Sequence, residues 1–233
     1  MAITTTTQGI RNGACLSTAR PSNPYLGMVI FETDTNKMRV WLGSVWSDGY
    51  THVYTPPTYD FDSLATVTVG AGGTPTITFS DIPSTYKHLQ IRGISKQSAT
   101  TTGFPNVGAY FNSDTTYTNY RSHYLNGNGS AVGPGNVQAA GYYAYSFNTI
   151  TSYSGYANIF GVMVMDILDY ASTNKNKTIR TLGGQDANGS GEVVFTSGLW
   201  MNSSTAINAV TFTLPGGGNF SQYTQFALFG IKG

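Results

Sequence analysis

The feature that most constrains the fold is a short hairpin motif over residues 20–46, near the N-terminus. A short apolar run at residues 28–31 is followed by a polar Asp-Thr-Asn turn at residues 34–36. The turn leads into a second run that contains Trp41 and Trp46. An isolated two-stranded hairpin buries too little apolar surface to be stable in water. The motif therefore predicts a small module that neighbouring copies of the chain complete.

Alternation along this hairpin predicts apolar side chains on both of its faces. On the first strand Met28 and Ile30 share one face with Glu32, whereas Val29 and Phe31 share the other. Burial of both faces of so short an element requires partners. We expect an oligomer interface that contains Met28, Ile30, Phe31, Val40, Trp41 and Trp46.

The composition favours an all-β fold with few charges. Charged residues are 10% of the 233 residues, against roughly 25% in ordinary globular proteins. Aromatic residues are 13%, which is enough to supply a core, and the frequent Gly, Asn and β-branched residues suit turns and strands. The net charge of +1 gives no electrostatic footprint for nucleic acid, so we expect no nucleic-acid partner.

The sequence predicts four segments. Residues 1–20 are rich in small polar residues; they form either a free tail or an extended N-terminal arm that orders on docking, and we favour the arm. Residues 21–50 are the β-hairpin module for trimerisation or attachment. Residues 51–62 are a stiff Pro-rich linker around Pro56-Pro57. Residues 63–233 are the main domain, a jelly-roll-like antiparallel β-sandwich.

Within the main domain, short strand-like runs alternate with Gly, Asn and Pro turns at the spacing of a sandwich or barrel. No segment shows sustained helical periodicity. The run at residues 157–168 is nearly continuously apolar, so we expect a central strand that is covered on both faces. The other predicted strands are residues 66–69, 76–79, 89–93, 107–111, 121–125, 178–182, 192–201, 206–214 and 222–231.

Targeting signals and disulfides are not expected. The N-terminus has neither a basic segment nor a long apolar one, which argues against a signal peptide. The most apolar run, residues 159–168, contains Asp166 and is far shorter than a bilayer span. Cys15 is the single cysteine, so no disulfide can form within the chain, and we expect an unreactive thiol. We expect synthesis in a cytoplasm and no membrane insertion.

No group of residues has the spacing of a catalytic or metal site. Asp166 and Asp169 are three residues apart and would point to opposite faces of a strand, which argues against a paired-carboxylate hydrolase. Asp60 and Asp62 share a face, but two carboxylates are too few for calcium. They follow the Pro-Pro linker, so we expect solvated spacer residues. The three histidines are far apart, and no Gly-x-Ser-x-Gly elbow exists. We therefore expect no enzyme, no metal and no cofactor.

Tyrosines cluster with Asn, Ser and Gly between residues 110 and 156. This combination is typical of adaptable binding surfaces, and aromatic faces with amide donors also suit sugars. The alternative, which we favour, is that these rings edge the sandwich or its intersubunit seams. If a receptor surface exists, its candidate contacts are Tyr117, Tyr120, Tyr124, Tyr142, Tyr143 and Tyr145.

The hairpin resembles a module that recurs in virion fibre and appendage proteins of tailed bacteriophages. It contains Pro-x-x-Gly at residues 24–27, Phe-x-Thr-Asp-Thr at 31–35 and Trp-x-Gly-x-x-Trp at 41–46. Residues 79–93 and the C-terminal Phe-Ala-Leu-Phe-Gly-Ile-Lys-Gly, residues 226–233, are similar to stretches of jelly-roll-like phage virion domains. The long middle of the chain matches no such motif.

The resemblance implies a structural subunit of the virion, made in the host cytoplasm. The favoured form is a homotrimeric tail fibre or tail appendage, anchored by its N-terminus, whose sandwich faces the host surface and its glycans. The alternative is a head fibre or capsid decoration protein that stabilises the capsid. A glycan-degrading enzyme is disfavoured because carboxylates are scarce and no long β-helix repeat is present. The implied partners are sister copies, other virion proteins and a host glycan.

Overall fold

The chain forms two compact units, Met1–Thr58 and Tyr59–Gly233. The computed structural model describes residues 13–47, 60–98, 106–137, 144–146, 158–187, 189–215 and 217–233. The Pro56-Pro57 part of the predicted linker lies outside these ranges. The linker prediction was wrong at its C-terminal end, because Phe61 and Asp62 already belong to the first strand of the second unit.

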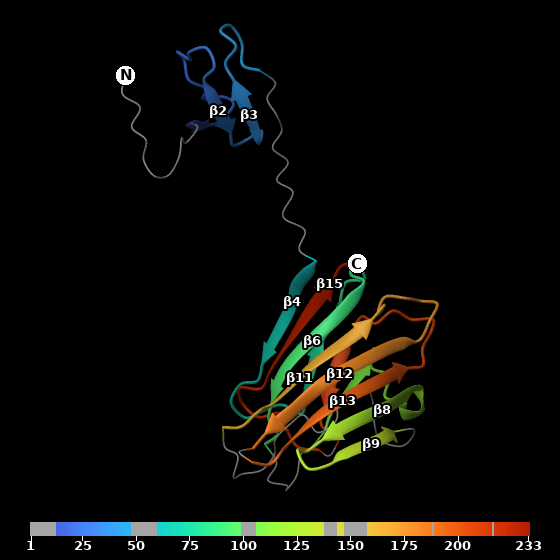
Figure 1. Cartoon of the computed structure of the whole chain (residues 1–233). Helices are drawn as coiled ribbons and strands as arrows, with labels where there is room; N and C mark the ends of the chain where they lie inside the picture. The colour runs from blue at the N-terminus through green and yellow to red at the C-terminus, as the bar shows by residue number, and fades with distance from the viewer. Residues whose placement is uncertain are drawn as a thin grey trace. The chain divides into compact units, whose positions relative to one another are not determined.

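The N-terminal unit is a three-stranded sheet rather than a two-stranded hairpin. Its order is β1 (Gly13–Cys15), β2 (Val29–Glu32) and β3 (Lys37–Val40), of which β2 and β3 are labelled in Figure 1. Strand β1 runs parallel to β2, and β2 and β3 are antiparallel. Residues 13–15 of the predicted arm are thus part of the module itself. Strand β1 pairs with the edge of β2, which the predicted two-stranded hairpin would leave unpaired.

The second unit contains an eight-stranded sheet in which every neighbouring pair is antiparallel. Figure 1 shows this sheet nearly face-on. In spatial order its strands are β4 (Phe61–Thr68), β15 (Gln225–Ile231), β6 (His88–Ser95), β11 (Gly161–Leu168), β12 (Lys177–Asp186), β13 (Gly191–Trp200), β8 (Tyr120–Gly127) and β9 (Val132–Val137).

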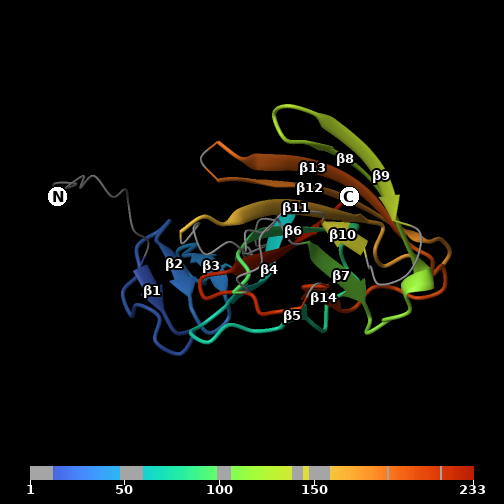
Figure 2. The same cartoon turned by 90° about the horizontal axis from the view of Figure 1, so that it is seen from below.

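A smaller, four-stranded antiparallel sheet lies against one face of the large sheet (Figure 2). Its order is β10 (Ala144–Ser146), β7 (Val107–Phe111), β14 (Val210–Thr213) and β5 (Thr76–Phe79). The described residues otherwise contain one 3-10 turn, η1 (Tyr117–Asn119), and no helix among them could cross a membrane. The all-β prediction is confirmed, whereas the jelly-roll detail stays a prediction.

The core of the second unit lies between its two sheets. Alternate residues of β11 and β5 turn inward, as in the buried Met163, Met165 and Phe79. Aromatic rings fill the centre: Phe226 of β15 stacks on Phe212 of β14 with 4.6 Å between ring centroids. The buried aliphatic and aromatic side chains of both sheets form one continuous cluster. The face of the large sheet that meets the small sheet is therefore its inner face.

The outer face of the large sheet has no such cover within the described part of the second unit. Val162 and Val164 of β11 point to this face and are 54% and 37% exposed. The prediction that the apolar run ending at Leu168 is covered on both faces was therefore wrong for the single chain. Apart from Asp166, its inward and outward residues are apolar, but only the inward ones are buried.

Gly93 provides a test of how tightly the core is packed. A Cβ atom added there would lie 2.7 Å from the ring of the buried Phe226. We expect Gly93→Ala to destabilise the second unit by about 1–3 kcal/mol, because the packed ring cannot move away. The matched control is Gly70→Ala, where nothing lies within 4 Å, and the expected change is below about 0.5 kcal/mol. Urea unfolding of both variants measures the difference, and equal stabilities would contradict this packing.

Candidate interaction surfaces

A buried ionic cluster holds the N-terminal unit together. The Glu32 side chain at the end of β2 is fully buried. Its Oε1 accepts a hydrogen bond of 2.6 Å from Arg20 Nε, and its Oε2 accepts one of 3.1 Å from Arg39 Nε. Thr35 Oγ1 donates to Oε2 at 2.6 Å. A second bond from Arg39, Nη1 to the Ser47 carbonyl at 2.7 Å, ties the end of the module to the same cluster.

These donors keep the Glu32 carboxylate ionised despite its burial. The Thr35 hydroxyl has the largest effect and lowers the pKa of Glu32 below its ordinary 4.5; burial opposes this, and Arg20 and Arg39 lower it further. Because the folded-state pKa is depressed, Glu32 stabilises the folded unit fully above about pH 4.5. That contribution is lost as the pH falls through the folded-state pKa.

This cluster was not predicted from the sequence. Glu32 was placed on one face with Met28 and Ile30 and was assigned no partner. Arg20 lies twelve residues upstream, beyond any local pairing rule, and Arg39 is a diagonal neighbour on the facing strand. The one available signal was that the module carries a single glutamate close to several basic residues in a sequence with few charges.

The predicted interface residues of the module divide into two groups. Ile30 is buried by its own chain, so its assignment to an intersubunit contact was wrong. Trp41 and Trp46 pair with 5.3 Å between ring centroids and an interplanar angle of 59°, and both remain half-exposed. Met28, Phe31 and Val40 are also half-exposed. Five further large apolar side chains of the unit are mostly exposed: Leu16, Tyr25, Leu26, Leu42 and Val45.

The three candidate receptor tyrosines whose side chains the structure describes do not share one surface. Tyr142 and Tyr143 lie outside the described residues, and Tyr145 is described only as backbone within β10. Tyr117 is partly exposed in η1, whereas the Tyr124 ring lies over Gly135 of β9. These positions leave a receptor role for the tyrosines a prediction without a common site.

Tyr120 was wrongly predicted as a surface residue. Its side chain is only 2% exposed. The hydroxyl donates to the Asp114 carbonyl at 2.9 Å and accepts from the Phe111 amide at 3.1 Å. Trp200 Nε1 donates to the Asp114 carboxylate at 2.8 Å, so the two rings share one structural network. A tyrosine that the alternation places inward, as here on β8, belongs to the core.

The candidate carboxylates of the sandwich are held in ion pairs. Asp169 contacts Lys87 at 2.9 Å and also Lys175, whose hydrogen bond contributes most to lowering the pKa of Asp169 to about 2. Asp166 accepts a hydrogen bond from Gln90, and Asp62 pairs with Lys232 at 3.0 Å. The expectation that Asp62 is a solvated spacer residue was wrong. Across the described ranges no three His, Cys, Asp or Glu side chains could hold a metal ion.

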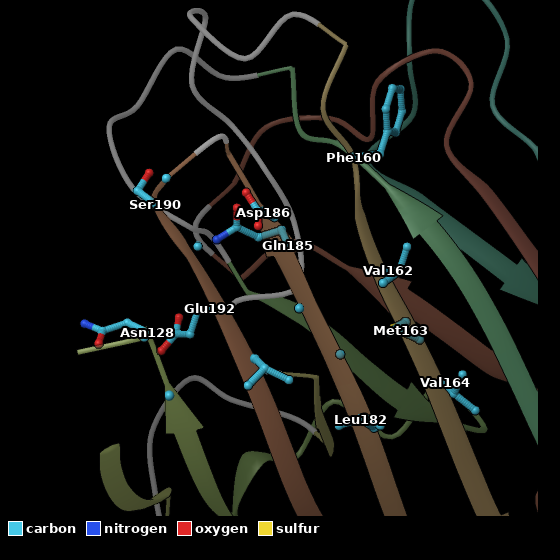
Figure 3. A pocket seen from close by; sticks show the side chains of 17 residues that line it. Asn128, Phe160, Val162, Met163, Val164, Leu182, Gln185, Asp186, Ser190 and Glu192 are labelled. Atoms are coloured by element: carbon cyan, nitrogen blue, oxygen red, sulfur yellow. The ribbon is translucent and has the colours of Figure 1, made fainter. Parts of the chain in front are cut away.

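One concave feature lies on the outer face of the large sheet. It is a groove of about 920 Å³, lined by β11, β12, β13 and the turns at their ends. Gly183 and Gly184 form part of its lining. Figure 3 shows Val162 and Val164 on one side of the groove and Asn128, Ser190 and Glu192 on the other. Its chemistry is therefore mainly apolar, with polar side chains at one end.

No family model, no curated protein and no solved structure matched the chain. The geometry of the two units and the motifs of the sequence are therefore the basis for the functional proposal.

Glu32→Gln tests the ionic cluster, because the amide cannot carry the charge that Arg20 and Arg39 face. We expect faster hydrogen exchange over β2 and β3 at pH 7, with β11–β13 unchanged, since they belong to the other unit. The difference from the native chain should shrink as the pH falls from about 4.5 through the lower folded-state pKa of Glu32, where the native side chain also loses its charge. Exchange rates corrected for intrinsic pH dependence measure this. A difference that persists unchanged to pH 3 would contradict the assigned role.

Proposed function

We propose that this protein is a structural subunit of a tailed-bacteriophage virion that associates with copies of itself through its N-terminal unit. The observation that carries the proposal is the apolar surface of that unit. Its sheet is three short strands, and large side chains such as Leu26 and Tyr25 are mostly exposed. A surface of this kind on a small unit is typical of a protein–protein interface.

The motifs of the module support the same proposal. The Phe-x-Thr-Asp-Thr stretch supplies Thr35, which bonds to Glu32, and Asp34, which accepts hydrogen bonds from Ser17. The Trp-x-Gly-x-x-Trp stretch supplies the Trp41–Trp46 pair. The residues that carry the resemblance to phage appendage modules are thus the ones that shape the unit and its apolar surface.

Within the virion, we propose a homotrimeric tail fibre or tail appendage whose sandwich reaches toward the host surface. Apolar and aromatic packing between the N-terminal modules would join the subunits. The Pro-Pro segment would act as a spacer between each module and its sandwich. Imaging of particles with labelled copies distinguishes a tail position from a head or capsid position.

Trp41→Ala tests the module as an assembly unit. We expect the native chain to have three times the 24.9 kDa chain mass in light scattering. Loss of the half-exposed ring, and of its contact with Trp46, should lower the mass while the circular dichroism of the sandwich is unchanged. Tyr117→Ala, which removes a partly exposed ring from the other unit, should keep the native mass.

Two results would contradict the proposal. A native chain that stays monomeric at high concentration would exclude the homotrimer. A Trp41→Ala variant that assembles normally but loses sandwich structure would exclude the module as the site of assembly.

A further inference from the structure

Two rows of apolar side chains run across the outer face of the large sheet. In the first row, cross-strand pairing aligns Val164, Leu182, Phe195 and Leu125 on four successive strands. The second row lies two residues along each strand from the first, on the same face. There the cross-strand pairing aligns Ile94, Val162, Gly184, Val193, Gly127 and Val132. The outer patch is defined as the eight non-glycine residues of these rows: Ile94, Leu125, Val132, Val162, Val164, Leu182, Val193 and Phe195.

The outer patch is at the upper end of the apolar patches that monomers expose, a size that is often functional. Its side chains are exposed for 37–71% of their area. Eight side chains of this size present on the order of 600 Å² of apolar surface, more than a few hundred Å² and close to the roughly 800 Å² that each partner contributes to a standard interface. The groove lies within this patch, where Gly184 interrupts the second row between Val162 and Val193.

We propose that the outer patch is an interface between sandwiches of sister subunits, so that a second copy of this chain occupies it. The proposal rests on the self-association proposed above and adds a second site for it, on the other unit. The area of the patch is one argument, because it matches what a stable subunit contact needs.

Charge supplies the second argument. Arg92 pairs with Val164 at the β6 end of the first row and lies over the rings of Phe61 and Phe229. Asp166 and Arg180 flank the row on the same face, two residues from Val164 and Leu182, and they pair with each other at 4.0 Å. The carboxylates of Asp186 and Glu192 lie beyond the rows, at the β12–β13 turn. A sister copy that presents the same neutral rows would bury no unpaired charge, which would otherwise be costly.

The edges of the large sheet favour contact through its face. Strand β9 is one edge, and its Pro134 has no N–H to offer an added strand. At the other edge, the pairing of β4 with β15 shifts register between Leu228 and Phe229. Such irregularities hinder strand addition at an edge. Packing of apolar faces is therefore the mode of association that this sheet fits.

Leu182→Asp and Phe195→Asp test the proposal in the full chain. Each puts a charge into the middle of the first row, and we expect the dissociation constant of the oligomer to rise by at least about tenfold. Thr66→Asp is the matched control, because Thr66 is exposed on the same sheet but lies on the edge strand β4. Light scattering over a dilution series measures the mass, and circular dichroism verifies the fold of each variant.

A second measurement does not depend on weakened assembly. Cys15→Ser gives a chain without cysteine, in which Leu182→Cys places one thiol in the outer patch. We expect a short bis-maleimide to link chains through this thiol and to link none through Thr66→Cys at the control position.

The outcomes separate this inference from the proposed function. The inference is overturned if Leu182→Asp and Phe195→Asp keep the oligomer mass of the native chain and no crosslink forms at position 182. Assembly through the N-terminal unit would still stand in that case. A monomeric native chain overturns both. Loss of mass in both patch variants with Thr66→Asp unaffected supports the interface.

Discussion

The organisation of the second unit depends on one constraint: an eight-stranded sheet has two faces, and this chain covers one of them. The four-stranded sheet packs on the inner face, where Met165, Phe212 and Phe226 are fully buried. The outer face keeps apolar residues such as Phe195 at positions where an antiparallel sheet that faces water would alternate to polar ones. If a sister subunit buried that face, these apolar residues would no longer be exposed to water.

The N-terminal unit differs from the second unit, because it has only a small apolar core. Glu32 lies buried among Arg20, Arg39 and Thr35, and these contacts join its β1–β2 connection, its turn and its last strand. Such a cluster fixes the shape of a small unit without a large apolar interior. The apolar side chains then remain on the surface, where Trp41 and Trp46 can serve assembly.

Much of the fold was predictable from alternation and turn residues. The strands Thr76–Phe79 and Val107–Phe111 have the predicted bounds, and most other strands differ from the prediction by a few residues at their ends. Alternation cannot tell which apolar face the chain itself covers, and for this reason β11 was wrongly predicted as covered on both sides.

The candidate sites were less predictable because they depend on contacts far apart in the sequence. Arg20 bonds to Glu32 across twelve residues of the β1–β2 connection, and Tyr120 bonds to a carbonyl that the fold brings within reach. The outer patch became visible only when register aligned Val164, Leu182 and Phe195 across three strands.

Hydroxyl-radical footprinting of the full chain at assembly concentrations tests the central claim most directly. It reports how accessible each side chain is within the assembled particle. Phe195 and Leu182 should be modified several-fold less than their exposure in the single chain implies, whereas Tyr223, exposed on the same unit outside the patch, should react freely. Modification of Phe195 in proportion to its 48% exposure would show that the outer face stays open to solvent and would contradict the account.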